Sequence, residues 1–150
     1  VVVLSRIDLG ASLVILGLVD GKPQQIAATP HIGRTHRWLA PVAAADMDGD
    51  GVIEIAYVDR PHLAKTLRVW RYESGDFYEA AALSGLTNHK IGDAFFQSGL
   101  RNCGQGPEFV TANADWTRIM TTRIAGDQMT SGDIGDYAGP ASITAALNCN

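Results

Sequence analysis

Between Trp38 and Phe77 the chain reads WLAPVAAADMDGDGVIEIAYVDRPHLAKTLRVWRYESGDF. This stretch holds four short apolar runs separated by turn residues, and none of them has a helical period. The runs are Trp38–Ala45, Val52–Val58, Leu67–Tyr72 and Phe77–Leu83. Short runs of this kind, bounded by aspartate, glycine and proline, are typical of antiparallel strands. The stretch therefore predicts one small sheet of four strands.

The same pattern recurs on both sides of this stretch. Val1–Thr29 aligns without a gap on Ile55–Leu83 at a constant offset of 54 residues, with six identities. A third copy starts at Phe109, where Phe109–Ala112 continues the offset of 54, and Arg118–Met120 matches Arg68–Trp70 after the loss of about four loop residues. A repeat of about this length is typical of stacked units such as propeller blades. We therefore predict an all-β chain made of β-propeller blades, each with four antiparallel strands.

The repeat divides the 150 residues into two and a half units. Residues 1–33 are expected to end one blade, 34–88 to form a complete blade, and 89–150 to form a degenerate blade with a C-terminal tail. Thr144–Leu147 is a candidate final strand. Closed propellers usually have four to eight blades. The chain is therefore expected to be the C-terminal part of a longer propeller, or one of several copies that assemble into a ring.

The turn after Ala45 places carboxylates at alternate positions of a loop. Calcium prefers six to eight oxygen ligands, and Gly49 and Gly51 let the backbone curl around an ion. The predicted Ca²⁺ ligands are the side chains of Asp46, Asp48, Asp50 and Glu54 and the carbonyl of Val52. The alternative is a solvated acidic turn, which is disfavoured because close carboxylates repel one another without a cation. An EF-hand is excluded, since it needs flanking helices and an acid at the position of Tyr57.

This loop, inside a repeat of this length, resembles the FG-GAP/VCBS repeats that build the β-propeller of integrin α-subunits and of many secreted bacterial proteins. In that family an Asp-x-Asp-x-Asp-Gly-x-x-Asp loop binds calcium within a blade. The resemblance is strongest over Trp38–Phe77, and it assigns Asp46, Asp48 and Asp50 as ligands, with Glu54 where aspartate is usual. It implies a role in adhesion or binding, or beside a separate catalytic domain.

The corresponding turn of the third copy, Asn102–Glu108, lacks the aspartates, so no calcium is predicted there. Its Cys103 and the distant Cys149 form a disulfide in an oxidising compartment or stay as two thiols, and the sequence leaves both readings open. A thiol–imidazole pair of Cys103 with one of the four histidines is a weaker reading than a structural cysteine. His31 and His89 occupy equivalent repeat positions, which indicates a repeated structural hydrogen bond.

Composition narrows the function further. A net charge of −4 gives no basic surface for nucleic acid. The longest apolar stretch, Leu9–Val19, is too short to span a membrane, which takes about 20 residues. Neither a Gly-x-Ser-x-Gly elbow nor a phosphate loop is present. These absences disfavour an enzyme, a nucleic-acid partner and a membrane span.

Two functional classes remain. The first is a non-enzymatic, calcium-stabilised propeller module outside the cytosol, extracellular or periplasmic, which binds a protein or carbohydrate. The second is the non-catalytic part of a secreted hydrolase or lyase whose active site lies on other blades. Trp116 and Tyr137 either stack on sugar rings or, as we favour, pack between blades. The acids Asp127, Asp133 and Asp136 are expected in a solvated loop rather than in a second cation site.

Overall fold

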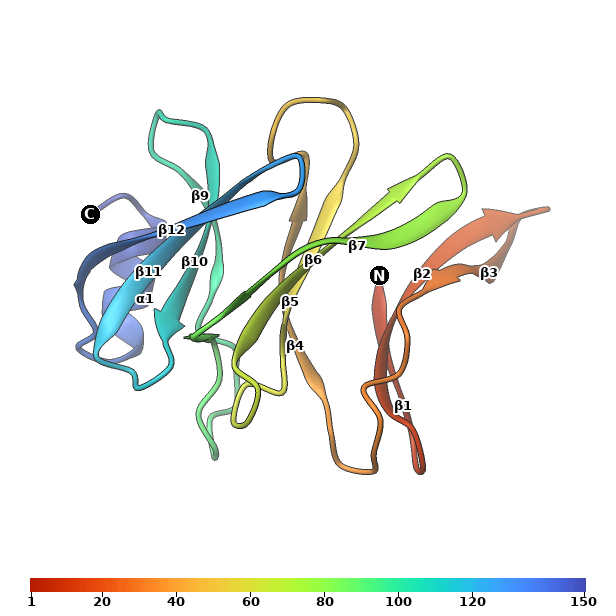
Figure 1. Ribbon diagram of the computed structural model, residues 1–150, viewed down its shortest axis with the longest axis horizontal. Coiled ribbons are helices and arrows are strands. Elements are labelled where there is room, and N and C mark those ends of the chain that lie inside the picture. The colour runs from red at the N-terminus through yellow and green to blue at the C-terminus, as the bar shows by residue number, and fades with distance from the viewer.

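A computed structural model describes residues 1–150 and shows three antiparallel sheets and one short helix (Figure 1). Sheet 1 contains β1 (Val2–Arg6), β2 (Gly10–Val19) and β3 (Lys22–Ala28). Sheet 2 contains β4 (Leu39–Ala45), β5 (Glu54–Asp59), β6 (Thr66–Glu73) and β7 (Asp76–Ser84). Sheet 3 contains β8 (Leu86–Thr87), β9 (Gly99–Asn102), β10 (Pro107–Asn113), β11 (Arg118–Ala125) and β12 (Gln128–Asp136). The helix α1 spans Pro140–Leu147. The prediction of an all-β chain is confirmed, and the four strands predicted around the aspartate turn are those of sheet 2.

The strand pairing confirms the internal repeat. In each sheet the last hairpin leaves one residue unpaired, because the register shifts by one at that point. The unpaired residues are Ile26 in β3, Ala80 in β7 and Ile134 in β12, each 54 positions after the one before. A β-bulge is a specific local feature of a strand pair. Its recurrence at this spacing agrees with the repeat predicted from the sequence for the last hairpin of each sheet.

Sheet 3 departs from this unit at its inner edge. In sheet 2 a single strand, β4, pairs along β5 and is interrupted only by a register shift at Val42. In sheet 3 the two short strands β8 and β9 share that role on β10. The chain between them, residues 88–98, leaves the sheet at the place that corresponds to Val42. The third copy thus enlarges a one-residue bulge into a loop.

The sheets pack face to face in series, with sheet 2 between the other two (Figure 1). All six residues of β5 are buried, because its alternating side chains enter two separate cores. Ile55 and Tyr57 pack with Ala11 and Leu13 of sheet 1. Ala56 and Val58, on the other face of β5, belong to a core that includes Phe109 and Ile124 of sheet 3. The aspartate loop therefore extends from the end of a strand pair that is fixed on both faces.

The helix α1 corrects the expectation of a final strand at Thr144–Leu147. Pro140 lies in the first turn of α1, where proline is favourable because its missing N–H is not needed. Ile143 and Ala146 of α1 are buried against Val110 and Ile119, so the helix covers the face of sheet 3 that points away from sheet 2. A disulfide between Cys103 and Cys149 ties the end of α1 to the turn between β9 and β10. Of the two readings that the sequence left open, a disulfide or two thiols, the structure shows the disulfide.

Candidate metal centre

The aspartate loop connects β4 to β5, and its geometry brings three carboxylates together. One oxygen each from Asp46, Asp48 and Asp50 lies within 4.8 Å of the others. The loop begins directly after Ala45 and ends where Glu54 starts β5, and Ala45 and Glu54 are register partners in the sheet. Because the two ends of the loop are held side by side in the sheet, the aspartates at alternate positions of the loop direct their carboxylates toward one region.

Backbone hydrogen bonds inside the loop hold this curl. Asp46 accepts hydrogen bonds from the N–H of Gly49 to Oδ1, at 2.7 Å, and of Gly51 to Oδ2, at 3.0 Å. Asp50 Oδ1 accepts from the N–H of Val52, at 2.8 Å. Gly49 and Gly51 have φ values of +82° and +88°, a region that other residues rarely adopt. The two glycines are therefore required by the shape of the loop.

Met47 and Glu54 anchor the loop to the protein interior. Met47 belongs to the core between sheets 2 and 3. Its N–H donates a hydrogen bond to Glu54 Oε2, at 2.7 Å. Glu54 is only 1% exposed and stays outside the group of three converging carboxylates. Burial raises the pKa of Glu54, and the charges of Asp48 and Asp50 act in the same direction.

Arg71 is the functional residue that the sequence reasoning did not single out. It projects from β6, where it is the register partner of Glu54, and its Nε lies 3.0 Å from Glu54 Oε1. Its guanidinium also pairs with Asp50 and lies 3.9 Å from Asp48 Oδ2. The hydrogen bond from Arg71, followed by that from the Val52 N–H, lowers the pKa of Asp50. The sequence contained a signal for this role, because a basic residue on the neighbouring strand opposite Glu54 forms a favourable cross-strand pair with it.

The loop also contacts the neighbouring sheet. Asp48 Oδ2 accepts a hydrogen bond of 2.9 Å from the N–H of Gly126, in the turn between β11 and β12. This bond links residues 78 positions apart in the chain. Any ion that holds Asp48 therefore also acts on the contact between sheets 2 and 3.

The donor set fits a hard divalent cation. Calcium takes oxygen ligands, and Asp46, Asp48 and Asp50 supply carboxylates that converge on one region. Glu54 Oε1 is buried without a hydrogen bond, since its contact with Arg71 has the distance but not the alignment of one. A buried oxygen without a partner is costly unless a positive charge is close. Val52 lies beside these groups, at the end of the loop, with its N–H directed to Asp50.

The other candidate residues have structural roles. His31 Nδ1 lies 3.0 Å from the carbonyl of Gly10, whereas His89 bonds to His62 and to Asp93, so the two histidines do not share one bond. The rings of Trp116 and Tyr137 pack on each other and on the Lys90 ammonium. Asp133 and Asp136 pair with Arg118, and Asp127 follows Gly126 in the β11–β12 turn.

A second charged cluster lies between sheets 1 and 2, in a cleft of about 550 Å³. Its Asp59 is 2% exposed and receives hydrogen bonds from Arg60 and Arg68. Burial alone would raise the pKa of Asp59, but these hydrogen bonds outweigh it and hold the pKa below its usual range. A carboxylate engaged by two guanidiniums is a poor general base. The cluster therefore serves to hold β5 and β6 rather than to move protons.

In comparisons with models of protein families, with curated proteins and with solved structures, nothing matches this chain. The chain has no helix of the length and apolar character that crossing a membrane demands. The disulfide is of the kind that persists in oxidising compartments.

Proposed function

We propose that this chain is a calcium-stabilised binding module built from propeller-type repeats of the FG-GAP/VCBS kind. The observation that carries the proposal is the convergence of Asp46, Asp48 and Asp50 within 4.8 Å on a loop between two strands of a repeated sheet. Calcium bound there has a structural role: it neutralises the loop and strengthens the Asp48 contact with the next sheet.

The packing of the sheets supports blades rather than unrelated sheets. Sheet 2 packs on sheet 1 through Ile55, Tyr57 and Trp70. The outer face of sheet 1, which points away from sheet 2, carries Val2, Leu4 and Leu16, which are 43%, 46% and 45% exposed. Each sheet thus offers an apolar face to a preceding one. Further blades, from the same chain or from other copies, fit this exposed face.

The proposal also includes the compartment in which the protein acts and the class of ligand that it binds. The disulfide favours an extracellular or periplasmic location, where calcium is abundant enough to occupy a loop site. A protein or carbohydrate ligand suits a module whose described charged clusters are ion pairs rather than acid–base pairs. We propose that the chain itself is not an enzyme.

The test is the thermal stability of the protein with a chelator and with added calcium. A ligand that binds only the folded state stabilises it by about 2.7 kcal/mol at a hundredfold excess over its Kd. We expect calcium to raise the Tm by several degrees and Asp48→Ala to abolish this rise. Asp76→Ala, at the first residue of β7, is the matched control and keeps the rise. Identical melting curves with and without calcium would refute the calcium site.

A further inference from the structure

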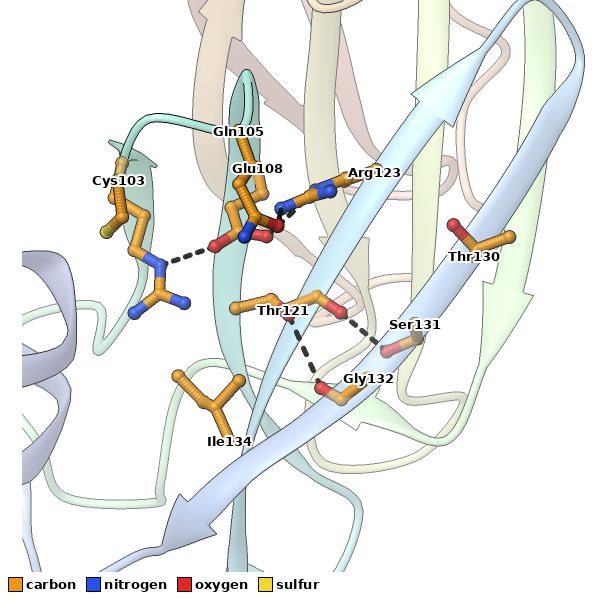
Figure 2. A pocket seen from close by; sticks show the side chains of 10 residues that line it. Cys103, Gln105, Glu108, Thr121, Arg123, Thr130, Ser131, Gly132 and Ile134 are labelled. Carbon is orange, nitrogen blue, oxygen red and sulfur yellow. Dashed lines mark hydrogen bonds and ion pairs between the residues drawn. The ribbon is translucent and has the colours of Figure 1, made fainter. Parts of the chain in front are cut away.

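The turn that replaces the aspartate loop in sheet 3 borders a pocket of about 450 Å³ (Figure 2). Only two of its ten lining residues are hydrophobic. The charged and hydroxyl side chains that line it are Arg101, Glu108, Arg123, Thr121, Thr130 and Ser131. The pocket is therefore a polar site with both charges and hydroxyl groups.

Glu108 positions both arginines of the pocket. This carboxylate is 4% exposed, and its two oxygens are each taken by a different guanidinium. Arg101 Nε lies 2.7 Å from Oε1, and Arg123 Nε lies 3.0 Å from Oε2. Figure 2 shows the Glu108 carboxylate directed at Arg123. Both guanidiniums are thus held in place before any ligand binds.

The guanidiniums of Arg101 and Arg123 have N–H donors without a partner, and their positive charge exceeds the negative charge of Glu108. Besides Glu108, Arg101 donates to the carbonyl of Ala146, at 2.8 Å, and Arg123 to Oε1 of Gln105, at 3.2 Å. A guanidinium has five N–H donors, so each arginine retains about three. No other acid lines the pocket, and one carboxylate cannot balance two positive charges. The pocket therefore favours an anion.

The charge of this pocket differs from that of the corresponding place in sheet 2. Glu108 corresponds to Glu54, and each of these carboxylates pairs with an arginine of the following strand, Arg71 in sheet 2 and Arg123 in sheet 3. Arg101, the register partner of Glu108, stands where sheet 2 has Ala45, the register partner of Glu54. The aspartates of the sheet 2 loop have no counterpart between Arg101 and Glu108. The same place in the repeat is thus rich in carboxylates in one sheet and in guanidiniums in the next.

We propose that the sheet 3 pocket binds the carboxylate of an acidic sugar, that is, a uronic acid or a glycan end that carries one. The arginines offer forked donors that match a planar carboxylate. The hydroxyls of Thr121 and Ser131 already donate to the carbonyls of Gly132 and Thr121. The hydroxyl of Thr130, the register partner of Arg123, suits a hydroxyl group of a sugar ring. The size of the pocket is in the range of small-molecule sites. This proposal gives the binding function proposed above its ligand class, and it uses no residue of the aspartate loop.

The probe is D-glucuronate, titrated against the oxidised protein by calorimetry, with D-glucose and inorganic sulfate in parallel. We expect glucuronate to bind and glucose not to bind. Arg123→Gln should weaken glucuronate binding about tenfold or more, the usual effect of removing a charged hydrogen-bond donor. Arg118→Gln is the matched control, because Arg118 is on the same strand, with a side chain 40% exposed against 42% for Arg123, and does not line the pocket. It should leave the affinity unchanged.

A second variant guards against a folding defect in Arg123→Gln. Thr130→Val keeps the size of an exposed side chain on β12 and removes only its hydroxyl, and we expect a weaker affinity for glucuronate with an unchanged Tm. Failure of glucuronate to bind, or sulfate binding as tightly as glucuronate, would overturn the proposal. The titrations are repeated with a chelator, so that a missing sugar site and a missing calcium site give separate results.

Discussion

Arg71 makes the aspartate loop tolerable without relying on a metal alone. Its side chain is 9% exposed and faces Glu54, Asp50 and Asp48. The hydrogen bond to Asp50 and the charges of Glu54, Asp50 and Asp48 raise its pKa, although burial acts in the opposite direction. A cation bound by the loop would share these carboxylates with the guanidinium. The loop therefore already has one source of positive charge from the protein itself.

Arg71→Met should destabilise the protein in the presence of a chelator by about 3 kcal/mol, because it leaves buried Glu54 without its ion pair. Calcium should then recover part of the loss, so that the calcium-induced rise in Tm exceeds that of the unchanged protein. Thermal unfolding with and without calcium measures both. Arg118→Met removes an exposed ion pair and should leave the Tm nearly unchanged. A calcium effect no larger in Arg71→Met than in the unchanged protein would show that the ion does not share these carboxylates.

A hydrogen bond between His62 and His89 makes stability depend on pH. His62 Nε2 and His89 Nδ1 are 3.0 Å apart, and His89 Nε2 faces the carbonyl of Asp93. A carbonyl only accepts, so His89 carries its hydrogen on Nε2, and its Nδ1 accepts from His62. Burial, and next the charge of His89, lower the pKa of His62 from its ordinary value of 6.5. The His62 ring is therefore neutral in the folded protein at neutral pH.

A histidine whose pKa is lowered by folding binds more protons when unfolded, so stability rises with pH through the unfolded pKa. The contribution of His62 is thus present above about pH 6.5 and is lost as the pH falls below it. We expect the Tm to decrease between about pH 7.5 and 5.5, and His62→Gln to flatten this decrease. A profile for His62→Gln as steep as that of the unchanged protein would assign the pH dependence to other groups.

The helix α1 and its disulfide close one end of the series of sheets. The helix packs on the outer face of sheet 3 through Ile143 and Ala146, and the carbonyl of Ala146 accepts a hydrogen bond from Arg101. The disulfide joins residues 46 positions apart and fastens the helix end to the β9–β10 turn. Since Arg101 and Cys103 both line the sheet 3 pocket, the helix and the cross-link also support that pocket.

Reduction of this disulfide, or the double change Cys103→Ser and Cys149→Ser, should lower the free energy of unfolding by about 4 kcal/mol, the chain-entropy value for a loop of this length. Chemical denaturation with and without a reductant measures the loss. Since Cys103 and Cys149 are the only cysteines, the Ser/Ser variant itself should not respond to the reductant. Equal stability of the oxidised and reduced protein would mean that α1 holds its place by packing alone.

The two ends of the series of sheets differ in what covers them. Sheet 3 is covered by α1, whereas the outer face of sheet 1 exposes Val2, Leu4, Leu16 and Leu18. Exposed apolar groups that lie together on one face are typical of surfaces that pair with another element. If the sheets are blades, further blades join at sheet 1.

Residues 1–150 should therefore self-associate through sheet 1 at high concentration. Leu18→Lys, at a position 76% exposed on that face, should reduce the association measured by sedimentation. Leu63→Lys is the matched control, since Leu63 is 69% exposed but lies in the connection between β5 and β6. Association that persists in Leu18→Lys and disappears in Leu63→Lys would place the interface elsewhere.

Local patterns in the sequence determined the strands of sheet 2, the repeat at an offset of 54 and the convergence of Asp46, Asp48 and Asp50. These features depend on alternation, on turn residues and on glycines with positive φ, all of which act within a few residues. The repeated bulges at Ile26, Ala80 and Ile134 show that the last hairpins of the aligned copies share one irregularity of strand pairing.

The tertiary structure decided the features that depend on partners distant in the chain. Thr144–Leu147 is helical, and the helix buries Ile143 and Ala146 against a sheet face. Arg71 and Arg101 acquire their roles only when β6 and β9 are aligned with their register partners. Cys103 and Cys149 pair because folding brings their Cα atoms within 5.7 Å. Hydrophobic periodicity reports which side of an element is buried, but not which element covers it, and this is why the sequence alone left these contacts open.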